Sequence, residues 1–174
     1  MQLLLPAQII KRLQRELRRA GRKEIGGLLM GEHARDEVFR VLDISVQRSG
    51  GSQACFIRDP AEHQVQLQEF FARTAEDYRR FNYLGEWHSH PSFEPIASST
   101  DIQTMQSIVS DPAVGVNFLT LLIPRLSRDK ELEATAMAFR PGVPPIAIPV
   151  SAEVDGQLRL ETKEHGWLRK MFRF

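Results

Sequence analysis

The sequence contains one cysteine, Cys55, among 174 residues. A lone cysteine cannot close an intrachain disulfide, and it cannot build a zinc knuckle from paired cysteines. The first residues also lack the basic start and the long apolar core of a secretion signal, and no apolar run approaches the roughly 18 residues that span a membrane. These absences lead us to expect a cytoplasmic protein in a reducing compartment, with no membrane contact.

An excess of charge of one sign is also missing, because 23 basic and 22 acidic residues leave a formal charge of +1. This balance disfavours a dedicated nucleic-acid-binding module. Hydrophobic residues make up 42% of the chain and charged residues 26%, an ordinary mixture for a compact domain. We therefore predict a single domain over residues 1–174 whose function depends on a local site.

Hydrophobic residues recur every three or four positions in three segments, which predicts three helices. The first ends before Gly21, since glycine commonly follows a helix. The second begins after Asp59 and Pro60, an N-cap residue followed by a first-turn proline. The third begins with a cap-like serine. The predicted helices span residues 6–20, 60–81 and 98–110.

Six further segments are rich in apolar or β-branched residues and end at polar, glycine or proline residues, which predicts strands. A short polar segment separates the first two, so we expect them to form a hairpin. Four later prolines, Pro141, Pro144, Pro145 and Pro149, exclude regular structure nearby or confine it to a sheet edge. The predicted strands span residues 25–31, 37–46, 54–57, 82–90, 117–123 and 131–140. This order of elements predicts an α/β or α+β sandwich with mostly antiparallel pairing.

The most informative stretch is Glu86-Trp87-His88-Ser89-His90-Pro91. Alternate side chains of an extended strand share a face, so His88 and His90 can hold one ion between their imidazoles. Asp101, in the first turn of the predicted third helix, can return its carboxylate toward the end of this strand. Two imidazoles and one carboxylate make a three-ligand zinc site with an open fourth position, as in catalytic zinc sites.

Ser98 and Asp101 also match a helix capping box, in which a serine hydroxyl and a carboxylate satisfy backbone N–H groups at the helix start. That pair taken alone is more typical of a cap, and two histidines at this spacing can form a buried hydrogen-bonded pair. The ordered combination of both histidines, the following proline, the serine and the aspartate favours a functional site. The remaining candidates are expected in the core or on the surface: His33, His63, His165 and Cys55.

A zinc hydrolase also needs a base that takes the proton from water. Two glutamates qualify by their spacing. Glu86 shares the strand face of His88 and His90. Glu24 precedes an Ile-Gly-Gly segment whose small residues allow another backbone to approach closely. Spacing does not choose between Glu24 and Glu86.

These residues resemble the JAMM or MPN-plus metalloproteases, whose pattern is a distant glutamate followed by His-x-His-Pro and then Ser-x-x-Asp. The match covers nearly the whole chain. The resemblance implies that His88, His90 and Asp101 hold one Zn²⁺ per chain. It also implies that Glu24 is the general base and that Ser98 helps to stabilise the oxyanion. The fold it implies is a curved, mostly antiparallel sheet flanked by helices.

The resemblance implies a hydrolase that cleaves the isopeptide or peptide bond after the C-terminal tail of a ubiquitin-like protein. We expect the tail to lie beside a sheet edge, where strand addition supplies backbone hydrogen bonds. The chain is similar to compact bacterial members encoded beside ubiquitin-like activating and conjugating enzymes, including antiphage operons, and these enzymes are expected partners. Processing of a ubiquitin-like sulfur carrier and a catalytically silent MPN scaffold are the alternatives.

Overall fold

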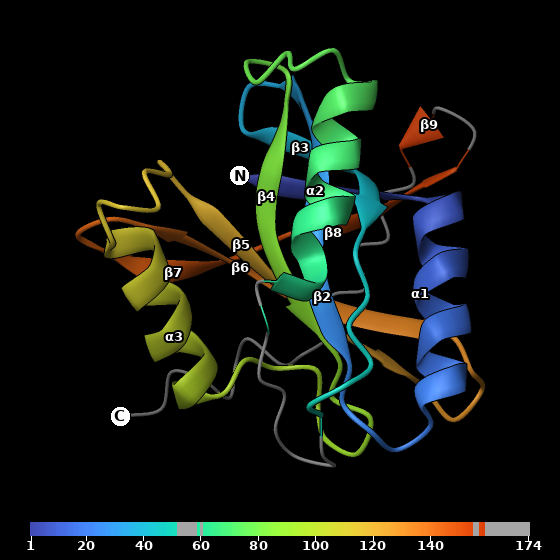
Figure 1. The fold of residues 1–174 in the computed structure, drawn as a ribbon. Helices are drawn as coiled ribbons and strands as arrows, with labels where there is room; N and C mark the ends of the chain where they lie inside the picture. The colour runs from blue at the N-terminus through green and yellow to red at the C-terminus, as the bar shows by residue number, and fades with distance from the viewer. Residues whose placement is uncertain (52–58, 60, 155–156, 159–174) are drawn as a thin grey trace.

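The structure is a computed structural model that describes residues 1–51, 59, 61–154 and 157–158 (Figure 1). The helices are α1 (Ala7–Ala20), α2 (Ala61–Arg73) and α3 (Ser99–Ser110). The strands are β1 (Gln2–Pro6), β2 (Gly26–Arg35), β3 (Val38–Ile44), β4 (Phe81–His88), β5 (Leu119–Leu126), β6 (Leu132–Arg140), β7 (Val143–Ile148), β8 (Val150–Val154) and β9 (Gln157–Leu158). A helix long and apolar enough to cross a membrane is not found in this part of the chain.

The strands form one curved sheet in the order β7-β6-β5-β4-β2-β3-β1-β8-β9 (Figure 1). Its parallel pairs are β1 with β3, β1 with β8, and β4 with β5. The other five neighbouring pairs are antiparallel. The predicted α/β fold with mostly antiparallel pairing is confirmed.

The two faces of β5 pack against different helices. Leu121 is buried in a cluster with Met105 of α3. Leu122, whose side chain points to the opposite face, is buried in a larger cluster with Leu13 of α1. Figure 1 accordingly shows α1 and α3 far apart, at the right and left of the view. This strand is apolar on both faces because both are covered.

Most predicted elements are present with small changes at their ends. The first helix ends at Ala20, where Gly21 has a φ of 63° and donates its N–H to the carbonyl of Leu17. The first two predicted strands form the expected hairpin of β2 and β3. The segments 82–90, 98–110, 117–123 and 131–140 correspond to β4, α3, β5 and β6. The predicted strand 54–57 lies outside the described residues.

Strands β1, β7 and β8 extend the sheet beyond the strands that were predicted. Strand β1 was not expected, because its short apolar run directly precedes the helical pattern that begins at Pro6. Strand β7 contains Pro144 and Pro145 and lies at an end of the sheet, which confirms the predicted edge position for these two prolines, whereas Pro149 directly precedes a strand that is paired on both sides. Strand β8, after Pro149, lies beside β1.

The predicted second helix is wrong beyond Arg73. Ala75 and Glu76 have φ values of 54° and 55°, in the left-handed region that a right-handed helix cannot contain. Phe81 is instead the first residue of β4. At the other end, Asp59 acts as predicted, because its carboxylate accepts the N–H of Ala61 at 2.9 Å.

Candidate metal centre

Two histidines at the end of β4 point to the same face of the extended backbone. His88 is the last residue of β4 and His90 lies two positions further, while Ser89 between them is fully buried. The centroids of the two imidazole rings are 5.1 Å apart. The alternation of side chains along an extended backbone therefore produces the predicted pair.

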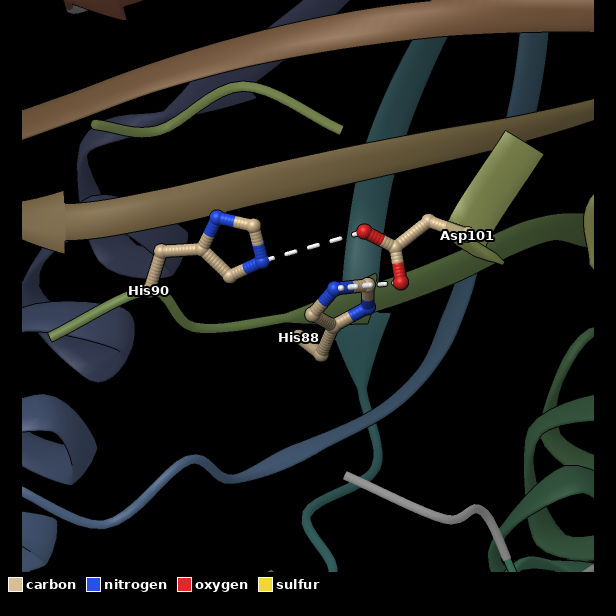
Figure 2. Close-up of side chains that lie close together, drawn as sticks. All are labelled: His88, His90 and Asp101. Carbon is tan, nitrogen blue, oxygen red and sulfur yellow. Dashed lines mark ion pairs between the residues drawn. The ribbon is translucent and has the colours of Figure 1, made fainter. Parts of the chain in front are cut away.

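Asp101 joins the histidines from the first turn of α3. Figure 2 shows its carboxylate directed at both rings. Oδ1 lies 3.3 Å from Nε2 of His88, and Oδ2 lies 3.8 Å from Nε2 of His90. The potential ligand atoms of the three residues all lie within 4.8 Å of one another. Over the described ranges, this is the one group of three or more such side chains.

The start of α3 holds the Asp101 carboxylate in place. The Ser98 hydroxyl accepts the backbone N–H of Asp101 at 3.2 Å, and the Ser98 backbone N–H donates to the Asp101 carboxylate at 2.7 Å. This is the capping box that the sequence suggested as the alternative interpretation. Both interpretations hold together, because the cap orients the same carboxylate that meets the histidines.

The electrostatics of Asp101 and His90 favour the forms in which these two groups bind a metal. Burial opposes ionisation of Asp101, but the hydrogen bond and charge of His88, together with the Ser98 contacts, hold the pKa of its carboxyl well below the usual range. Burial lowers the pKa of His90, and the Glu94 carbonyl only partly opposes this change. An ionised carboxylate and a neutral imidazole are the states in which these groups bind metals.

The ring of His90 is oriented by a backbone group. Its Nδ1 lies 3.1 Å from the carbonyl oxygen of Glu94. A carbonyl can only accept a hydrogen bond, so Nδ1 carries the proton of the neutral ring. Nε2, which faces Asp101, is then free of a proton, as metal coordination requires.

Glu24 lies in the segment that precedes β2, next to the strand end that carries the two histidines. Its neighbour Ile25 exchanges two hydrogen bonds with Ser89: the Ser89 N–H donates to the Ile25 carbonyl at 2.8 Å, and the Ile25 N–H donates to the Ser89 hydroxyl at 3.1 Å. Glu24 is only 4% exposed. Burial raises the pKa of its carboxyl, the charge of His88 lowers it, and the charge of Asp101 raises it. Glu24 therefore lies close to the cluster.

The glycines after Ile25 confirm the close approach predicted for this segment. Gly26 pairs with Gln47, and a Cβ atom added to Gly27 would lie 2.2 Å from the carbonyl oxygen of Ser45. Only glycine fits against that backbone. The small residues thus fix the path of the chain that carries Glu24.

Glu86, the alternative base, lies on β4 two residues before His88. Its side chain is half-buried and accepts a long hydrogen bond, 3.4 Å, from the Tyr83 hydroxyl. Two residues along a strand correspond to about 6.6 Å. Glu24 instead adjoins the residue that pairs with Ser89, between the two histidines. The contact of the Glu24 segment with the residue between the two histidines favours Glu24 over Glu86 as the proton acceptor.

Ser89 is a site residue that sequence reasoning missed. The signal for it was present, because a residue between two ligands on a strand points to the opposite face, which is here the core. The other candidates behave as expected: His63 is buried, and His33 is exposed and stacks on Phe39 with a centroid distance of 5.0 Å. Cys55 and His165 lie outside the described residues.

Comparison with known families decides the relationship of the chain. The family described as prokaryotic homologs of the JAB domain matches residues 6–141. The chain belongs to this JAB family. The matched range contains all five predicted site residues, from Glu24 to Asp101, and the resemblance to JAMM proteins is confirmed at the level of the family.

Curated relatives of this JAB chain include isopeptidase and proteasome proteins. A CD-NTase/cGAS isopeptidase of Vibrio cholerae is 39% identical over 94 residues, which cover 52% of this chain and 58% of the relative. The 26S proteasome non-ATPase regulatory subunit 14 of Dictyostelium discoideum is 34% identical over 48% of this chain and 26% of its own length. The Caenorhabditis elegans subunit of the same name is 33% identical over 53% and 30%. The chain thus matches little more than half of the Vibrio relative and under a third of the two proteasome subunits.

Two solved structures share the fold of the JAB chain. A Desulfitobacterium hafniense protein has a TM-score of 0.63 at 17% identity, covering 94% of this chain and 98% of that one. A Salinibacter ruber protein has a TM-score of 0.53 at 20% identity, covering 90% and 94%. At these identities the likeness concerns the fold alone.

The ligand set of the JAB chain fits a zinc ion. Zinc bonds of about 2.0–2.2 Å in a tetrahedron place ligand atoms about 3.3–3.6 Å apart. The Nε2 atoms of His88 and His90 lie 3.3 and 3.8 Å from different oxygens of the Asp101 carboxylate, and one ligand atom of each residue lies within 4.8 Å of the other two, so the three groups can converge on one ion. Two imidazole nitrogens and one carboxylate oxygen are ordinary zinc ligands, and three ligands leave one tetrahedral position open.

Proposed function

We propose that this chain is a zinc-dependent isopeptidase or peptidase that cleaves the bond after the C-terminal tail of a ubiquitin-like protein. Membership of the JAB family supports a hydrolase. The name of the Vibrio relative supports an isopeptide bond as the target. The observation that carries the proposal is the convergence of His88, His90 and Asp101 beside the buried Glu24.

His88, His90 and Asp101 would hold the zinc ion, with the His90 ring fixed by the Glu94 carbonyl. Zinc supplies Lewis acidity, which polarises a carbonyl group and makes water acidic enough to lose a proton near neutral pH. The capping bonds at Ser98 keep the Asp101 carboxylate turned toward the histidines. These contacts direct the ligand groups toward one point.

Glu24 would accept a proton from the attacking water and deliver it to the leaving amine. The water oxygen bonds to the carbonyl carbon, the C–N bond breaks, and the proton carried by Glu24 completes the amine. Burial raises the pKa of the Glu24 carboxyl, which suits a group that takes up and releases a proton near neutral pH.

Ser98 would donate a hydrogen bond to the oxyanion that forms at the attacked carbonyl. Its hydroxyl oxygen accepts the Asp101 N–H, so the hydroxyl proton stays available for donation. A donor aimed at developing negative charge stabilises the transition state. The cap and the oxyanion role use different parts of the same hydroxyl group.

The substrate we propose is a conjugate or a C-terminally extended precursor of a ubiquitin-like protein. The Vibrio relative is named for CD-NTase/cGAS, which supports a conjugate of a protein of that kind as one target here. Partner activating and conjugating enzymes in an antiphage operon, and a cytoplasmic location, stay predictions. The presence of the three ligands and of Glu24 favours an enzyme over a silent scaffold.

The test is to incubate the purified chain with ubiquitin-like proteins that carry C-terminal extensions, with and without a chelator. We expect cleavage after the tail that the chelator abolishes and added zinc restores. A sulfur carrier as the sole cleaved protein would support the alternative processing role. A zinc-loaded chain that cleaves none of these proteins would contradict the proposal.

A further inference from the structure

The loop of residues 89–98 determines both sides of the metal cluster. It contains the ligand His90 and ends at Ser98, the cap of the helix that carries Asp101. Helix and strand are absent from this described loop. Its backbone bonds to the sheet are at its start, where the Ser89 N–H donates to the Ile25 carbonyl at 2.8 Å and the His90 N–H donates to the Pro124 carbonyl at 3.2 Å, and within the loop the Ile96 N–H donates to the Glu94 carbonyl at 2.8 Å. The position of its middle relative to the sheet therefore depends on side chains from other elements.

Arg125, on β5, supplies such contacts to the middle of the loop. Its Nη1 donates to the Phe93 carbonyl at 3.0 Å, and its Nη2 lies 2.9 Å from the Glu94 carboxylate. Its Nε lies 2.7 Å from the carboxylate of Glu133 on β6. The planar guanidinium thus joins two consecutive loop residues to the β5–β6 hairpin, with geometry that a single ammonium group could not reproduce.

The residue that Arg125 holds is the one that orients His90. Glu94 accepts the His90 Nδ1 proton on its carbonyl while its carboxylate pairs with Arg125. Arg125 also holds the carbonyl of the preceding residue, Phe93. We propose that Arg125 is a positioning residue that fixes the Glu94 backbone and, through the Glu94 carbonyl, the ring of His90. The inference rests on the proposed zinc site.

A role in stability alone makes a different prediction. The side chains of Glu94 and Glu133 are 51% and 44% exposed, and ion pairs with partners this exposed contribute little to folding. Loss of Arg125 is therefore expected to leave the fold intact. A metal-binding imidazole that loses its orienting partner typically binds its metal about 10- to 100-fold more weakly. Zinc affinity and thermal stability thus separate the two roles.

The experiment compares Arg125→Met with Arg140→Met in the full chain. Arg140 is the control, because it is also a strand arginine that pairs with a glutamate, Glu37, at 2.7 Å, although its side chain is more exposed than that of Arg125. Zinc affinity is measured by competition with a coloured chelator, and thermal unfolding of the metal-free proteins checks that both fold. We expect zinc affinity to fall about 10- to 100-fold in Arg125→Met and to stay unchanged in Arg140→Met.

A second measurement reports which nitrogen of the His90 ring carries the proton. Nitrogen-15 spectra of the metal-free wild type should show His90 with its proton on Nδ1, and in Arg125→Met this preference should weaken. Arg125→Lys replaces Arg125→Met under the same criteria if the latter does not fold. A folded variant with wild-type zinc affinity would overturn the inference alone, whereas a wild type that binds no zinc would contradict the proposed function.

Discussion

The two sides of the metal cluster are held by different kinds of bonds. On the β2 side, Ile25 and Ser89 exchange buried hydrogen bonds, and Gly27 packs directly against the Ser45 backbone. On the α3 side, Asp101 is held by Ser98, an exposed residue. The candidate base thus depends on the sheet itself, whereas the carboxylate ligand depends on polar contacts that water can replace.

This difference separates the stability of the fold from the geometry of the ligands. Buried bonds within a sheet open only when much of the domain unfolds, while exposed bonds at loops and helix ends open locally. Substitutions on the β2 side should therefore affect unfolding, and substitutions on the α3 side should affect metal binding first.

The largest effect is expected on the α3 side, from Asp101→Ala. This change removes one ligand and leaves two imidazoles, so zinc should be lost or bound very weakly. Elemental analysis of the purified protein measures the zinc content. Asp111→Ala, at the other end of the same helix, is the matched control and should keep the metal. Full zinc occupancy in Asp101→Ala, and likewise in His88→Ala or His90→Ala, would show that the site is wrongly assigned.

The second prediction concerns the base on the β2 side. Glu24→Gln should retain zinc and lose about 10²- to 10⁴-fold in cleavage rate, because the proton transfer is removed while the ligands remain. Glu86→Gln should keep much more activity. Steady-state cleavage of a ubiquitin-like substrate with an extended tail compares them directly. An inactive Glu86 variant beside a nearly normal Glu24 variant would reverse the assignment of the base.

The third prediction compares one serine from each side. Ser89→Ala leaves the buried Ile25 N–H without its hydroxyl acceptor and should lower the free energy of unfolding by about 1–3 kcal/mol. Ser98→Ala removes a helix cap at an exposed position and should lower it by about 1 kcal/mol. Urea denaturation of the metal-free proteins measures both. A greater loss in Ser98→Ala than in Ser89→Ala would break the distinction between the two sides.

The smallest effect is expected for a threonine that contacts the loop. Thr135 donates to the Pro95 carbonyl from an exposed position, so Thr135→Val should change the free energy of unfolding by less than about 0.5 kcal/mol. Thr120 makes the equivalent bond to the Leu84 carbonyl at 3.0 Å but is fully buried, and Thr120→Val should lose about 1 kcal/mol. If Thr135→Val and Thr120→Val lost equal amounts of unfolding free energy, the exposed loop contact would be as stabilising as the buried sheet contact, against this prediction.

The parts of the site that could be predicted are those encoded by short patterns. The histidine pair follows from strand alternation, and the position of Asp101 follows from the capping pattern at Ser98, because both depend on neighbours in sequence. The choice between Glu24 and Glu86 could not be made this way. It depends on the pairing of Ile25 with Ser89, a contact between segments far apart in the chain.

The errors in the predicted fold have the same origin. Aromatic residues continue the helical spacing past Arg73, but the left-handed backbone at Ala75 and Glu76 ends the helix, and neither residue type announces that conformation. Strand β1 was missed because five residues carry too little pattern to predict a strand. It is stabilised by two neighbours, β3 and β8, that the local sequence does not contain.

The position of β1 has a consequence for how the protein folds. Leu3 is aligned with Phe39 of β3 on one side and with Val150 of β8 on the other. During synthesis β1 must therefore wait for β8 before its second edge is paired. Contacts between such distant residues slow folding, and an unpaired edge can meanwhile bind other chains. A stalled or truncated chain that ends before β8 would expose β1 in this way, and aggregation is the expected fate of such a product.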